Sequence, residues 1–279
     1  MNVVERHITY PGRGHWATLY PLFDLHTGAR RCNEKKLKRV IKEIADDPNA
    51  LWIGGGDYAE FINRKDPRHK ESDLAPWLHG VDDLARAQVG FLCELLTPIA
   101  PKCIGMLCGN HEGMLLKHAE RNVYWEILTA IKDASGHRDE LGLGHHGFIN
   151  LFFVRAERAV TRLTIMAEHG FGGGRLRGAD ALQLGRAFMA YDCDLYMVGH
   201  RHRAMVVPHS MSVVRGKQAV TVQRLACMVG TFRESNTRHN ESDPGDYADA
   251  MNYPPADIAG VKIRFNPDLF QLRGEVYAY

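Results

Sequence analysis

Five apolar runs of this chain stop at polar residues of the kinds that bind metal ions or catalyse reactions. Such runs are typical of buried strands, and in α/β sheets ligands bind beyond the carboxyl ends of the strands. Loops held at that edge bring together residues that are distant in sequence. The five run ends are Asp24-Leu25-His26, Gly56-Asp57, Gly109-Asn110-His111-Glu112, His169-Gly170 and Gly199-His200-Arg201-His202. We therefore expect these side chains to gather at one site.

The order of helical and strand patterns predicts the fold class. Helical periodicity is found at 33–48, with Asn33 as the N-cap, and at 80–99, about 114–131 and 178–191. Strands are expected at 17–26, 50–57, 102–112, 146–157, 159–170, 194–200, 203–214, 218–230, 260–265 and 269–279. Strands and helices alternate in the first half and strands dominate the second. This order predicts a layered α/β fold with sheet packed between helices.

Length and composition limit the remaining choices. A chain of 279 residues with 45% hydrophobic residues fits one sizeable domain spanning 1–279. A formal net charge of +2 gives no overall attraction to nucleic acid or membrane. The six cysteines form no CxxC motif, and neither a signal peptide nor a membrane-spanning apolar stretch is recognisable. We expect a cytoplasmic protein with no membrane partner.

The pair His200 and His202 raises the question of a metal site. Two histidines one residue apart occur by chance in solvated loops, and that interpretation stays open for the pair alone. Two neutral imidazoles on one face also bind divalent cations. The other run ends add carboxylates, an amide and further imidazoles without sulfur, a donor set that favours Mn, Fe or Zn. Seven donors are more than one tetrahedral ion needs and suit two ions that share a carboxylate.

These motifs, taken in order, resemble the calcineurin-like metallophosphoesterase superfamily. The family pattern is D-x-H, GD, GNH(E/D), H and GHxH, and the chain reads DLH, GGD, GNHE, EHG and GHRH over about 17–205. The resemblance implies a four-layer α/β/β/α sandwich, in which two mixed sheets are flanked by helices. The C-terminal strands and a candidate lid loop at 231–260 follow this core.

The resemblance also implies roles for individual residues. It places Asp24, His26 and His202 on a first metal ion, Asn110, His169 and His200 on a second, and Asp57 between the two. His111 is expected to protonate the leaving oxygen or to stabilise the transition state, with a helix-capping role as the alternative. The implied cofactor is a pair of divalent metal ions, with Mn²⁺ preferred and Fe, Zn, Ni or Mg as alternatives.

One motif departs from the protein Ser/Thr phosphatase members of the superfamily. Their GD motif continues as GDxxDR, whereas this chain reads GDYAEF. Glu60 replaces the acid that orients the catalytic histidine, and can still do so with a longer reach. Phe61 replaces a phosphate-binding arginine, and a phosphomonoester dianion needs such extra positive charge. The departure favours the phosphodiesterase and nuclease members.

The resulting functional prediction is hydrolysis of phosphodiesters in nucleotides or nucleic acid, by a hydroxide that bridges two metal ions. A phosphomonoesterase acting on proteins or small molecules is one alternative, and a metal-binding scaffold without activity is another. Serine and cysteine phosphatase chemistry has no support, because the chain has neither GxSxG nor CxxxxxR. A homo-oligomer is left open.

Two further segments offer positive charge. The stretch HGFGGGRLRGAD (169–180) is either a flexible turn or a loop whose Arg175 and Arg177 bind substrate phosphate. The loop 231–260, with Arg233, Arg238 and His239, is a second candidate for covering the site.

Overall fold

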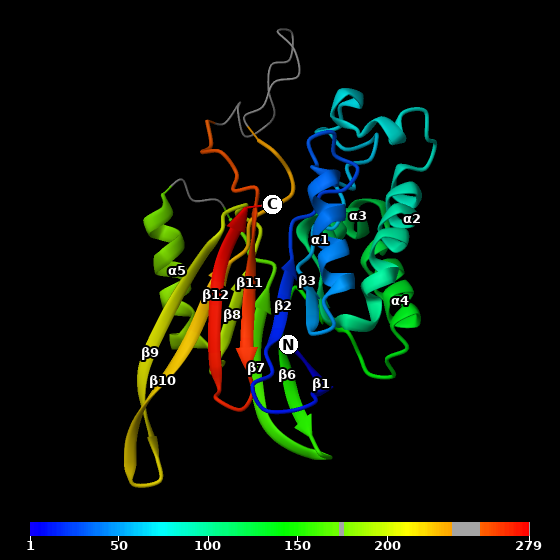
Figure 1. The fold of residues 1–279 in the computed structure, drawn as a ribbon. Helices are drawn as coiled ribbons and strands as arrows, with labels where there is room; N and C mark the ends of the chain where they lie inside the picture. The colour runs from blue at the N-terminus through cyan, green and yellow to red at the C-terminus, as the bar shows by residue number, and fades with distance from the viewer. Residues whose placement is uncertain (173–175, 236–251, 279) are drawn as a thin grey trace.

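The computed structural model describes residues 1–172, 176–235 and 252–278, and its core is two six-stranded mixed sheets (Figure 1). The first sheet has the order β1 (Asn2–Thr9), β6 (His146–Arg155), β7 (Arg158–Glu168), β8 (Leu195–Val198), β10 (Gln218–Met228) and β9 (Met205–Arg215). The second has the order β12 (Gln271–Ala278), β11 (Ala259–Asn266), β2 (Ala17–Leu22), β3 (Ala50–Gly54), β4 (Cys103–Leu107) and β5 (Gly142–Gly144).

Helices cover the outer sides of both sheets (Figure 1). Their bounds are α1 (Glu34–Asp46), α2 (Leu84–Leu96), α3 (Asn110–Ala119), α4 (Val123–Ser135) and α5 (Arg177–Ala190), and the short 3₁₀ turns are η1 (Glu71–Asp73), η2 (Pro76–Leu78) and η3 (Thr97–Lys102). Helix α5 lies against the first sheet, and α1 to α4 lie on the side of the second. The predicted α/β fold, with two mixed sheets flanked by helices, is confirmed.

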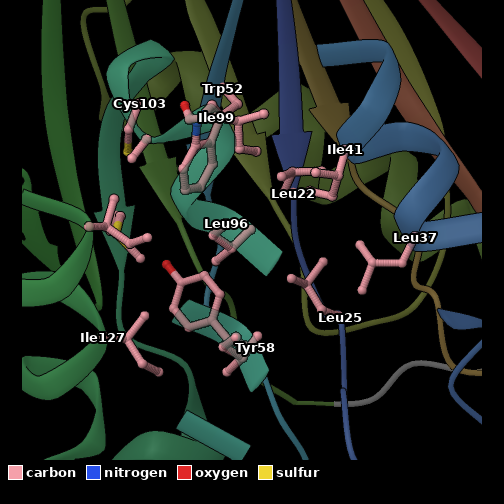
Figure 2. Packing of buried hydrophobic residues seen from close by; sticks show 14 of the residues in the cluster. Leu22, Leu25, Leu37, Ile41, Trp52, Tyr58, Leu96, Ile99, Cys103 and Ile127 are labelled. Carbon is pink, nitrogen blue, oxygen red and sulfur yellow. The ribbon is translucent and has the colours of Figure 1, made fainter. Parts of the chain in front are cut away.

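The second sheet packs against α1, α2 and α4 through one large apolar cluster (Figure 2). Helix α1 contributes Leu37 and Ile41, which face Leu22 and Leu25 from the end of β2. Buried polar atoms in this layer have partners: the Trp52 indole donates to the carbonyl of Ile99 at 2.7 Å. Leu25 and Tyr58, in the loops after β2 and β3, are buried in the same cluster, and this burial holds the two loops in place.

Separate apolar clusters fill the other two interfaces. Between the sheets lie side chains such as Phe23, Ile53 and Ile149, and α5 packs Leu184 and Phe188 against the outer face of the first sheet. Each interface removes apolar area from water, at roughly 25 cal/mol per Å². The sheets and helices therefore form a rigid support for the loops between them.

Parallel pairing places the predicted run ends on one edge. Strands β2, β3 and β4 are mutually parallel in the second sheet, and β8 runs parallel to both β7 and β10 in the first. All five strands that precede the predicted ligands therefore point their carboxyl ends the same way within their sheets. Each sheet therefore presents its run ends at one edge, and the packing of the two sheets brings the two edges together.

The structure corrects three details of the predicted elements. The five strands before the site residues stop earlier than expected, with β2 ending at Leu22 and β4 at Leu107, so the site residues lie on loops or, for Asn110 and His111, at the start of α3. The expected helix 114–131 is two helices, because Glu120 adopts a left-handed conformation (φ 54°) and Asn122 caps α4. Strand β1 was not predicted; its outward-facing residues weaken the apolar pattern.

The six cysteines all lie in the described residues and none forms a disulfide. Among the described helices, none has both the length and the apolar composition required to span a membrane.

Candidate metal centre

Loops after five strands bring the predicted donors together. Asp24, His26 and His202 form one group and Asp57, His169 and His200 form another, and within each group the candidate ligand atoms lie within 4.8 Å of one another. Asn110 joins the second group, since its Oδ1 lies 3.0 Å from Nε2 of His169. All seven side chains that the resemblance pointed to thus meet at one site.

Asp57 lies between the two groups. Its Oδ2 atom is 3.4 Å from Nε2 of His169 in one group and 3.9 Å from Nε2 of His26 in the other. In the group of Asp24, His26 and His202, the Nε2 atoms of the two histidines lie 3.1 Å apart. This is the position that a carboxylate shared by two cations requires.

Hydrogen bonds on the far side of two imidazoles fix their tautomers. Nδ1 of His169 donates to the carbonyl of Gly55 at 2.8 Å, and Nδ1 of His26 bonds the Glu60 carboxylate at 3.0 Å. With one proton held at Nδ1, each ring in its neutral form presents the Nε2 lone pair to the cluster. Such outer partners are the usual support of metal-bound histidines.

Asp24 provides a direct test of whether the site fits a cation. Its side chain is fully buried, and Oδ2 accepts the backbone N–H of His200 at 2.8 Å. The other oxygen, Oδ1, is buried without a hydrogen-bond partner and lies 3.7 Å from Nε2 of His202. A buried carboxylate oxygen without a hydrogen-bond partner is costly in its charged form unless a cation binds there. The donors therefore fit divalent metal ions.

The backbone is strained at the same residues. Five of the seven donors have left-handed conformations: Asp24 (φ 50°), His26 (φ 49°), Asp57 (φ 50°), His200 (φ 67°) and His202 (φ 54°). Such conformations cost about 1–3 kcal/mol each and concentrate at functional sites. Glycine is required at Gly199, where a Cβ would lie 2.7 Å from Oδ2 of Asp24.

Burial and mutual charge set the protonation of the donors. Burial lowers the pKa of His26 and His202 and lowers that of His200 to about 4, so these rings are neutral and free to bind metal. Burial alone would also lower the pKa of His169, but the Asp57 carboxylate raises it to about 10. Burial raises the pKa of Asp24 to about 8. In the metal-free protein, the protonated His169 ring forms a buried ion pair with the Asp57 carboxylate.

His111 borders the cluster and its ring is oriented by the backbone. Nδ1 donates to the carbonyl oxygen of Glu60, which leaves Nε2 facing the site, 3.9 Å from Oδ2 of Asp57. Burial alone would lower its pKa, but Asp57 and Glu60 raise it overall. His111 also lies close enough to His26 and Glu60 to form a third group of potential ligands. Its position allows proton donation into the site, as expected for an acid.

The role expected of the Glu60 side chain needs revision. It was expected to orient the catalytic histidine, but its carboxylate hydrogen-bonds His26, and only its backbone carbonyl contacts His111. The reason is local geometry, because the residue's main chain already occupies the space beside Nδ1 of His111. The side chain therefore supports a metal donor.

A pocket of about 350 Å³ opens beside the donors. It is lined by five of the seven donors, by Glu60 and His111, and on the other side by Arg201, Arg203, Arg233, Ser235 and residues 253–256. The described ends of the loop 231–260 thus line the site, whereas Arg238 and His239 fall outside the described residues.

Of the two arginines predicted near residue 175, only Arg177 is in the described residues, and it does not line this pocket. Arg175 lies outside the described residues. Arg177 is half exposed and makes a two-pronged ion pair with Asp257, at 2.7 and 3.0 Å, outside the pocket lining. The sequence predicted that Arg177 binds a substrate phosphate, but in the structure its guanidinium binds the Asp257 carboxylate.

Sequence reasoning assigned no role to two buried acids that hold the site in place. Asp180, on the first turn of α5, binds Arg201 at 2.6 Å and Arg203 at 3.4 Å, on either side of His202. Glu112 accepts the backbone N–H groups of Asp57, Tyr58 and Gly109 at 2.8–2.9 Å. Glu112 was visible in the GNHE motif, but no local pattern indicated Asp180.

Comparison with known proteins finds no matching family model and no matching curated protein. Among solved structures, one match is the crystal structure of a conserved uncharacterized protein, a predicted phosphoesterase, from Streptococcus pneumoniae TIGR4. Its TM-score is 0.33 and its sequence identity 8%, over 95% of this chain and 99% of that chain. Similarity this low says nothing about the chemistry of the site, and function is inferred from geometry.

Proposed function

We propose that this protein is a phosphoesterase that uses two divalent metal ions. The observation that carries the proposal is the position of Asp57 between two groups of N and O donors, with a pocket and His111 beside them. Asp24, His26 and His202 would hold one ion, and Asn110, His169 and His200 the other. The absence of sulfur among these donors favours Mn, Fe or Zn. We propose Mn²⁺, with Fe, Zn, Ni and Mg as alternatives.

The chemistry divides between the ions and the chain. Two bound divalent ions supply charge for the phosphoryl oxygens and lower the pKa of water, so that hydroxide is available near neutral pH. The chain fixes the donors through Gly55, Glu60 and Glu112 and excludes bulk water by burying Asp24 and Asp57. His111, whose Nε2 lies 3.9 Å from Oδ2 of Asp57, would give a proton to the leaving oxygen.

The charge of the pocket wall favours phosphodiesters as substrates. Three arginines line the described pocket, but Arg201 and Arg203 both face Asp180, and Arg233 faces Glu60 at 3.7 Å. The two carboxylates offset two of the three positive charges, which leaves a net charge of about +1 for the substrate. A monoanionic diester needs less positive charge than a dianionic monoester, so we propose phosphodiesters of nucleotides or nucleic acid.

Hydrolysis of two model substrates tests the proposal. The purified protein is loaded with Mn²⁺ and its kcat/KM compared for bis-p-nitrophenyl phosphate and p-nitrophenyl phosphate. Faster diester hydrolysis is expected, whereas faster monoester hydrolysis would support the phosphomonoesterase alternative. A protein that binds metal but hydrolyses neither, nor any of single-stranded DNA, duplex DNA, RNA or cyclic nucleotides, would be a scaffold.

A further inference from the structure

Phe61 occupies the position at which part of the superfamily has a phosphate-binding arginine. Phe61 is buried in the apolar cluster beneath the second sheet and lines a separate cavity beside α3. Its backbone N–H donates to the side chain of Gln88 at 3.0 Å. A cation for the substrate must therefore enter the pocket from elsewhere in the chain.

Arg233 enters the pocket from a segment tied to the metal loop. The hydroxyl of Thr231 donates to the carbonyl of Asp24 at 2.7 Å, and the N–H of Phe232 donates to the same oxygen at 3.2 Å. Thr231 and Phe232 are fully buried, and Arg233 pairs with Cys32 through a β-bridge. The backbone of Arg233 is thus fixed relative to a metal donor.

The side chain of Arg233 keeps donors available on the pocket side. It remains partly exposed (21%) and lies 3.7 Å from the Glu60 carboxylate, which is an ion-pair distance longer than a hydrogen bond. The atom nearest Glu60 is Nε, which is buried without a hydrogen-bond partner among the described residues, so a substrate in the pocket would meet the terminal nitrogens instead. The guanidinium groups of Arg201 and Arg203 are less available to a substrate than that of Arg233, because both pair with the buried Asp180.

We infer that Arg233 binds a non-bridging phosphoryl oxygen of the substrate, in place of the arginine that position 61 lacks. This inference rests on the proposed function and assigns Arg233 the recognition of the phosphate group itself. A guanidinium presents N–H groups in a fixed fork that matches phosphate oxygens. Glu60 orients the fork at rest, and its link to His26 sets the distance between Arg233 and the donors.

The experiment compares Arg233→Ala, Arg233→Lys and wild type, each loaded with Mn²⁺. Arg121→Ala is the matched control, because Arg121 pairs with Asp83 and Glu126 away from the pocket. Calorimetry measures the affinity for inorganic phosphate, and kinetics with bis-p-nitrophenyl phosphate gives KM. Mass spectrometry counts bound manganese. We expect Arg233→Ala to weaken phosphate binding and raise KM at least about tenfold, with manganese content unchanged.

Arg233→Lys should recover part of the phosphate affinity, because it keeps the charge and loses the fork. Wild-type phosphate affinity in Arg233→Ala overturns the inference, and so does loss of manganese from both Arg233 variants, which would assign the residue to the metal site. Arg233-dependent phosphate binding without turnover of any ester would sustain the inference and refute the proposed function.

Discussion

The Glu60 carboxylate hydrogen-bonds Nδ1 of His26 at 3.0 Å, on the side of the ring opposite the donor cluster. Burial alone would raise the pKa of Glu60, but Arg233 and His26 lower it, so the group is ionised. An ionised acceptor holds the proton at Nδ1 and leaves Nε2 for a metal ion. Glu60 therefore belongs to the support of the metal centre as well as to the pocket wall.

Glu60→Ala should weaken Mn²⁺ binding about 10- to 100-fold, because His26 loses the partner that fixes its tautomer and orientation. Isothermal titration with Mn²⁺ measures the effect. Glu60→Gln is the control, since its amide oxygen still accepts from Nδ1 and should retain most of the affinity. Equal Mn²⁺ affinity in Glu60→Ala and wild type would show that the hydrogen bond does not support the site.

Asp180→Ala should destabilise the protein and loosen the loop that carries His200 and His202. The acid is fully buried between Arg201 and Arg203, and its removal leaves two cations facing each other. Losing one partner of such a network costs about 3 kcal/mol of unfolding free energy. Urea denaturation of the metal-free protein checks the stability, and Mn²⁺ titration checks the loop.

A matched control for Asp180→Ala is Arg177→Ala, which breaks an ion pair that is half exposed on its arginine side. Exposed pairs contribute about 0–1 kcal/mol, so this variant should stay close to wild type in stability. If both variants lost the same stability, the burial of Asp180 would not be the cause.

The donor set was predictable because each donor is encoded locally, at the end of an apolar run. Parallel pairing aligns these ends within each sheet, and the packing of the two sheets against each other then brings Asp24, which follows β2, close to His202, which follows β8. The two-helix nature of 110–135 was missed because the apolar spacing continues across the break at Glu120.

Contacts that depend on tertiary packing were not predictable from the sequence. The fixed position of Arg233 follows from hydrogen bonds between Thr231 and Asp24, which no periodicity encodes. The Glu60 carboxylate was expected at His111 and lies at His26, because side-chain reach depends on the path of the main chain. Arg177 was similarly indicated as a phosphate ligand but pairs with Asp257.

Metal uptake should be pH-dependent and release protons. Asp57 holds the pKa of His169 at about 10 and burial holds that of Asp24 at about 8, so both bind protons near neutral pH without metal. Metal ligands must be deprotonated, so Mn²⁺ affinity should rise with pH up to the His169 value. The rise should be roughly tenfold per pH unit for each proton released. Titrations in buffers of different ionisation enthalpy count these protons; an affinity independent of pH would contradict the ion pair of His169 with Asp57.

His111→Ala should retain both metal ions and lose turnover by about 100- to 10,000-fold, because the proton donor is removed while the seven donors remain. The loss should be larger for an alkyl phosphodiester than for bis-p-nitrophenyl phosphate, since p-nitrophenolate leaves without protonation. His118→Ala is the control, as it removes an exposed histidine from the same helix. Steady-state kinetics and manganese counting check both variants. Loss of manganese from His111→Ala would instead identify His111 as a ligand, in keeping with its closeness to His26 and Glu60, and unchanged turnover would remove it from the chemistry.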